Sequence, residues 1–156
     1  DFQKVTGPSS PTYASLLSPD TMKVHPLRLK PGEDMRRSME TFLNEHNIRA
    51  AVVLSCVGSL RKVPFRFAGG TDTTLLSGKF EIVSMEGTLS VNGCHLHIAV
   101  ADNHGKTSGG HLQYGSEICT TAEVVIAELP GMEFIRETDA ATGYKELVVR
   151  QPGNRQ

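Results

Sequence analysis

Residues 31–57 read PGEDMRRSMETFLNEHNIRAAVVLSCV, and the hydrophobic pattern of this segment changes halfway along. In the first half, large side chains recur at the three- and four-residue spacing of one helix face: Met35, Met39, Phe42, Leu43 and His46. Asp34 can cap the first helical turn, and Asn47 can end the helix in a left-handed conformation. From residue 50 to 57 the chain is apolar and rich in valine, which predicts a strand buried on both faces.

Outward from this segment, nine short apolar runs bounded by turn residues are strand candidates, from which we expect seven or eight strands. The candidates lie at residues 22–29, 50–57, 63–67, 79–85, 87–91, 94–101, 120–127, 132–136 and 145–150. Pro26 favours an edge position for the first strand. Gly-containing turns, such as Asn92-Gly93, join most neighbours directly. The pattern predicts an α+β fold, with a largely antiparallel sheet and one main amphipathic helix.

Length and composition indicate a single domain. The chain has 156 residues, of which 38% are hydrophobic and 21% charged. We expect a flexible N-terminal arm at residues 1–21, the domain at 22–150 and a short tail at 151–156. The net charge of −1 excludes a broad field that draws the molecule to nucleic acid or an anionic membrane. Short basic groups, Arg36-Arg37 and Arg61-Lys62-Arg66, still allow a local basic patch, and no apolar run has the ~20 residues of a membrane helix.

The three cysteines, Cys56, Cys94 and Cys119, show no CxxC spacing and each lies in an apolar stretch. An odd number of such cysteines predicts buried free thiols and a reducing compartment. We therefore expect an intracellular protein, cytoplasmic rather than nuclear. Because the chain starts at Asp1 and not at Met, it is expected to be trimmed or processed.

Two histidines, His95 and His97, alternate with apolar residues in CHLHIAV at 94–100. Strand alternation places both imidazoles on one face, about 6.6 Å apart along the strand, opposite a core face. A three-residue loop at 103–105, with Gly105 left-handed, would pair this strand with the next so that His97 faces His111. A loop of even length, or a bulge at Gly109-Gly110, would turn His111 to the other face.

Three neutral imidazoles with one open position suit zinc or another divalent metal, whose bound water can ionise near neutral pH. The alternative is that these histidines only line a polar groove or a subunit contact. If the site is catalytic, the chain is a metal-dependent hydrolase or lyase, with Glu123 or Asp102 as the base. His25, His46 and His104 are expected to be structural or surface residues.

Several ordered motifs resemble those of the PPC domain, found after AT-hooks in plant nuclear proteins and alone in many prokaryotic ones. They are GGHLQYG at 109–115, TAEVV at 121–125, LKPGED at 29–34, VGSL at 57–60, GKFEIVSMEG at 78–87 and HLH at 95–97. The resemblance covers roughly residues 23–150. It implies a homotrimer, in which His95, His97 and His111 are the histidines that some members use to hold a metal.

The resemblance also gives roles to other residues. Glu123 matches a family glutamate, which is either partnered inside a subunit contact or orients a histidine. The family's DNA-binding label implies a DNA-associated regulator. This chain lacks the Arg-Gly-Arg-Pro core of an AT-hook, so we rank a binding or scaffold module for a metal or small ligand first, a DNA-associated regulator second and an enzyme third.

Two glycine-containing sites are candidates for binding. Gly109-Gly110 predicts a β-bulge and bend, or else a close backbone approach to a ligand or another subunit, which makes Gly110 a candidate ligand-binding residue. Gly58-Ser59 offers backbone N–H groups to an anion but lacks a nucleotide-loop pattern.

Overall fold

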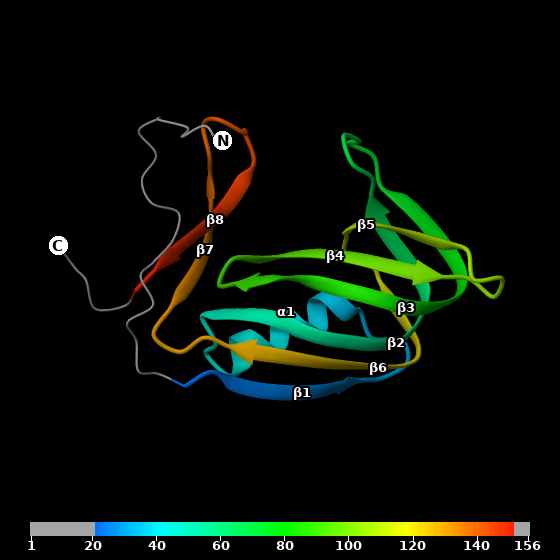
Figure 1. The fold of residues 1–156 in the computed structure, drawn as a ribbon, viewed down its shortest axis with the longest axis horizontal. Coiled ribbons are helices and arrows are strands. Elements are labelled where there is room, and N and C mark those ends of the chain that lie inside the picture. The colour runs from blue at the N-terminus through cyan, green and yellow to red at the C-terminus, as the bar shows by residue number, and fades with distance from the viewer. Residues whose placement is uncertain (1–20, 152–156) are drawn as a thin grey trace, which may run out of the picture.

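A computed structural model describes residues 21–151, and Figure 1 shows them as an α+β fold with one helix. The elements in chain order are β1 Lys23–Leu29, α1 Met35–Glu45, β2 Ala50–Arg66, β3 Thr74–Ser90, β4 Gly93–Ala101, β5 Thr107–Leu112, β6 Glu117–Glu128, β7 Glu133–Thr138 and β8 Lys145–Arg150. The predicted fold class is confirmed. The predicted arm and tail, apart from Thr21 and Gln151, lie outside the described residues. No helix in the described range has the length and apolar character to cross a membrane.

Six strands form one antiparallel sheet in the order β1-β6-β2-β3-β4-β5. The far end of β2 also pairs with β5, where Phe65 lies opposite Leu112 and Arg66 opposite His111. Strands β2, β3, β4 and β5 therefore form a closed ring of pairings. As predicted from Pro26, β1 is an edge strand, because among the strands of residues 21–151 it pairs with β6 alone.

The last two strands form a separate two-stranded sheet, β7-β8, whereas the sequence predicted one sheet. Pro130 and the left-handed Gly131, with φ 75°, end β6 and turn the chain away from the main sheet. In Figure 1 the hairpin stands beside the end of the sheet where β3 turns into β4. Backbone hydrogen bonds of 3.0 Å from Val91 to Phe134 and from Phe134 to Arg49 attach it there.

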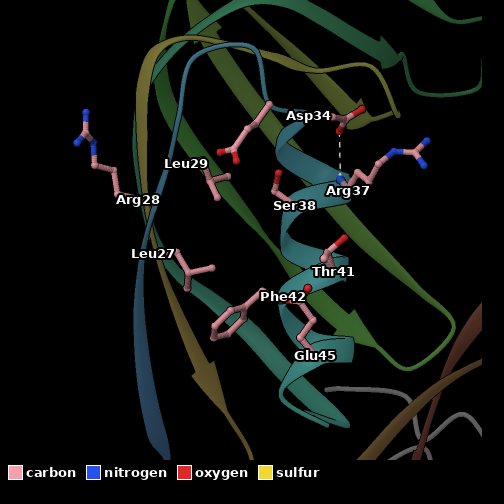
Figure 2. Close-up of a pocket in the computed structure, with 10 residues that line it drawn as sticks. Leu27, Arg28, Leu29, Asp34, Arg37, Ser38, Thr41, Phe42 and Glu45 are labelled. Carbon is pink, nitrogen blue, oxygen red and sulfur yellow. Dashed lines mark hydrogen bonds between the residues drawn. The ribbon is translucent and has the colours of Figure 1, made fainter.

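The helix forms as its sequence predicts. The Asp34 carboxylate accepts a hydrogen bond of 3.1 Å from the backbone N–H of Arg37, drawn as the dashed line in Figure 2. Met35, Met39 and Leu43 are buried against the sheet. Asn47, with φ 54°, supplies the left-handed residue that ends the segment.

Strands β2 and β3 are longer than predicted, since each joins two predicted strands. The break predicted between residues 57 and 63 lies inside β2, and the break predicted at residue 86 lies inside β3. A Cβ at position 58 would lie 2.2 Å from the carbonyl oxygen of Thr121 on β6. Glycine therefore lets the backbone bend and still pair, where the sequence pattern alone indicated a loop.

Candidate metal centre

The hairpin β4–β5 brings the histidines together with the predicted register. His97 lies directly opposite His111, and the regular pairing continues to Ala101 and Thr107. The loop is closed by a 3.0 Å hydrogen bond from the backbone N–H of Asp102 to the carbonyl of Lys106, with Gly105 at φ 78°. Both the loop length and the facing of His111 are confirmed.

The three imidazoles converge on one side of the sheet. One ring nitrogen from each of His95, His97 and His111 lies within 4.8 Å of the other two. The Nε2 atoms of His95 and His97 are 3.2 Å apart. Three nitrogens at roughly 2.0–2.1 Å from a tetrahedral zinc ion would be about 3.3 Å from one another. The cluster therefore fits a tetrahedral metal after a small closure of the third ring.

Electrostatic surroundings keep two of these rings in the form that binds metal. Burial, followed by the positive charges of His95 and Arg66, lowers the pKa of His111 to about 4. Burial and the charge of Arg136 also lower the pKa of His95. Because a metal binds the neutral imidazole, neither ring has to lose a proton at neutral pH before coordination.

Arg36 positions the cluster through the backbone next to two of its histidines, and the sequence did not reveal this role. Its guanidinium, which is buried, donates to the carbonyl of Cys94 at 2.8 Å and to that of Leu112 at 2.9 Å. These carbonyls belong to the neighbours of His95 and His111. One side chain from α1 therefore connects the two strands that carry the ligands.

Glu86 is a second residue that the sequence analysis missed. It lies directly opposite His97 on β3 and is exposed. Cross-strand partners have Cβ atoms roughly 4.5–5.5 Å apart, and Glu86 and His97 line the same hollow. The Asn92-Gly93 hairpin signal would not have found it, because a two-residue loop at Asn92-Gly93 places Thr88 opposite His97. The observed pairing, in which Ser90 faces Gly93, is what places Glu86 opposite His97.

The glycine pair before His111 makes a close approach within the chain. No bulge interrupts the pairing of β4 with β5, so the bulge interpretation is wrong. A Cβ at Gly109 would lie 2.3 Å from the Ile98 carbonyl oxygen, and one at Gly110 would lie 2.6 Å from that of Arg66. Gly110 also borders a hollow that contains His97, and its role in ligand binding stays a prediction.

The two candidate general bases, Asp102 and Glu123, have positions away from the histidine cluster. The Asp102 carboxylate accepts hydrogen bonds from the backbone N–H groups of His104 and Lys106, which lower its pKa. Asp102 therefore stabilises the loop between β4 and β5. Glu123 is exposed on β6, opposite Arg28 and Val57, and β6 does not pair with either cluster strand.

The remaining histidines and the cysteines have structural or surface positions. The His25 imidazole lies 2.8 Å from the Glu128 carboxylate, His46 caps the helix end, and His104 is exposed. Burial raises the pKa of Cys56 and Cys94 to about 12. Cys94 faces the core, away from its neighbour His95, and is not a ligand candidate.

A second hollow, between β1 and α1, contains none of the cluster histidines. Its volume is about 400 Å³, and Figure 2 shows Leu27 and Phe42 lining it along with charged side chains. Its charged lining contains both signs, with Arg28 and Arg37 beside Glu33, Asp34 and Glu45, so no single sign of charge attracts a ligand.

Comparisons with known proteins agree with this architecture. A family model described as the Plants and Prokaryotes Conserved (PCC) domain matches residues 17–130. A protein from Salmonella cholerae-suis, described as hypothetical, has a solved structure with 42% sequence identity and a TM-score of 0.82, covering 85% of this chain and 96% of that one. A metal-containing protein from Archaeoglobus fulgidus is 30% identical, with a TM-score of 0.69 over 81% of this chain and 93% of that one.

Another relative is much longer than this chain. The bifunctional protein GlmU of Synechococcus sp. strain JA-2-3B'a(2-13) is 43% identical over 142 residues, which are 91% of this chain and 22% of that protein. The chain thus spans about a fifth of this relative's length. Because the family model covers most of the chain, the protein belongs to the Plants and Prokaryotes Conserved domain family, the family that its motifs resemble.

Proposed function

We propose that this domain is a binding module that holds one divalent metal ion, zinc in the first instance, on His95, His97 and His111. The observation that carries the proposal is the convergence of three ring nitrogens within 4.8 Å. The relative from Archaeoglobus fulgidus, described as metal-containing, adds support. Zinc bound by three imidazoles keeps a fourth position for water or a ligand oxygen and acts there as a Lewis acid.

Metal analysis tests this directly. We expect protein purified without chelator to carry about one metal per chain, and chelated protein to regain it from zinc. Free zinc at 100 times its Kd should stabilise the fold by about 2.7 kcal/mol, which raises Tm by about 5 °C or more. Elemental analysis and thermal unfolding measure both. A metal-free preparation whose Tm is unmoved by zinc, cobalt or nickel would refute the proposal.

A homotrimer is the second part of the proposal. The outer face of the sheet exposes three large aliphatic side chains, Leu54 at 51%, Val57 at 53% and Val83 at 58%. Exposed apolar side chains on one face of a sheet mark an interaction surface where they gather into a patch. Glu123 lies opposite Val57 on this face, in agreement with the expectation that the glutamate is partnered inside a subunit contact.

Charge on this face should break the assembly. We expect wild type to have the mass of three 16.9 kDa chains and the double variant Val57→Lys, Val83→Lys to have the mass of one. In a trimer of the variant, three buried copies of each lysine would repel one another. Light scattering after gel filtration gives the mass. Asn103→Lys, which adds charge in the exposed β4–β5 turn, should stay trimeric. A wild type that is monomeric at high micromolar concentration would exclude the trimer.

The DNA-associated and enzymatic roles stay predictions. Arg61 and Lys62, which the sequence marked as part of a basic patch, both pair with Glu117, at 3.0 and 2.9 Å. Arg36, from the other basic pair, is buried. Pairing and burial reduce the positive charge that these residues offer to phosphate groups.

A further inference from the structure

A cavity of about 610 Å³ adjoins the histidine cluster. His95 and His111 form part of its wall, and the β7–β8 hairpin supplies another part through Arg136, Tyr144 and Glu146. Cavities of roughly 300–1,000 Å³ are the usual size for small-molecule sites. Two of the three metal-ligand candidates therefore face a space that can hold a small molecule.

The charged lining of this cavity is mainly positive. Its cationic residues are Arg36, Arg66, Arg136 and Lys145, and its only carboxylate is Glu146, among the described residues. The Arg36 guanidinium also lies 3.3 Å from the Glu40 carboxylate, which offsets part of its charge. In a chain whose net charge is −1, this concentration of positive charge favours an anion.

Arg136 supplies a donor that lacks a partner. The residue is 9% exposed, and the Asn92 side chain holds its backbone through hydrogen bonds of 2.7 and 2.9 Å. Its Nη2 donates to Thr88, yet its Nε is buried with no hydrogen-bond partner among the described residues. Leaving a buried charged donor unsatisfied is costly, so a guanidinium that is held in place with its Nε unpaired indicates a missing acceptor.

We propose that this cavity binds a small molecule through an oxyanion, which is either a carboxylate or a phosphate group. Arg136 and Arg66 donate hydrogen bonds to this group beside the metal. Arg66 donates to the Gly70 carbonyl at 3.0 Å through Nη1 and pairs in register with His111. Guanidinium groups suit both anions because their N–H groups match pairs of oxygens. Only the contact between ligand and metal rests on the proposed function; the anion site itself does not.

The test uses inorganic phosphate and succinate as probes on the whole 156-residue chain, each with chelator and then with zinc. We expect saturable binding in the metal-free protein, with the side-chain Nε–H resonance of Arg136 shifting in NMR spectra. Arg136→Gln and Arg66→Gln should each weaken binding at least about tenfold. Lys79→Gln, which removes an equal charge from an exposed position outside the cavity, should leave the affinity unchanged. The preferred probe identifies the anion class.

Three outcomes would overturn the anion site. They are an absence of saturable binding of either probe, equal weakening by Lys79→Gln and the two arginine variants, and binding that needs zinc and ignores Arg136→Gln. If Arg136→Gln fails to fold, Arg66→Gln and the wild-type Nε–H resonance still decide. Loss of zinc binding with retained phosphate binding would refute the metal centre alone, so the two failures are distinguishable.

Discussion

His97→Ala is expected to lower the affinity for zinc by at least about 100-fold. Outer residues that only orient a ligand are worth 10–100-fold, so loss of one of three coordinating nitrogens should exceed that range. The fold should survive, since His97 is exposed and its backbone pairing with His111 does not depend on the side chain. Competition with a calibrated zinc chelator measures the affinity, and circular dichroism checks the fold.

Two further variants sharpen this test. His104→Ala removes an exposed imidazole from the β4–β5 turn, seven positions along, and should bind zinc like wild type. His111→Ala should lower the affinity for zinc as much as His97→Ala does, because the hairpin register makes the two rings cross-strand partners. If His97→Ala and His104→Ala bind zinc equally well, the metal does not sit on this cluster.

Gly87→Ala is expected to cost about 4 kcal/mol of unfolding free energy, a large part of the stability of a domain this size. A Cβ on Gly87 would lie 1.9 Å from the carbonyl oxygen of His95 and 2.9 Å from the Leu96 Cα. Both atoms belong to backbone, so relief requires β3 and β4 to separate. Because His95 moves with β4, zinc affinity should fall as well. Urea unfolding measures the first effect and chelator competition the second.

Gly78→Ala is the matched control in the same strand. Gly78 has φ 151° and Gly87 has φ 152°, so alanine meets the same backbone strain at both positions. At Gly78 the nearest atom is a Phe80 ring carbon at 3.4 Å, and the loss should be only about 1–2 kcal/mol. Equal losses at the two positions would show that strands β3 and β4 can part without cost, contrary to the close approach seen here.

Local chemistry in the sequence was enough to predict the helix, the fold class and the central part of the candidate site. The cap at Asp34 and the stop at Asn47 act within a few residues of their own position. The same is true of the β4–β5 hairpin, in which loop length fixes the register. Strand alternation has a period of two, so this register settles that His97 faces His111.

The tertiary structure alone decided what surrounds the histidines. The placement of β6 between β1 and β2, the closure of β2 onto β5, and the reach of Arg36 from α1 join residues far apart in the chain. The separate β7–β8 hairpin likewise brings Arg136 to His95's side of the fold. Spacing along a single sequence contains no information on which distant strands will pair. Those pairings depend on how the whole core packs, because only that packing repays the entropy of closing long loops.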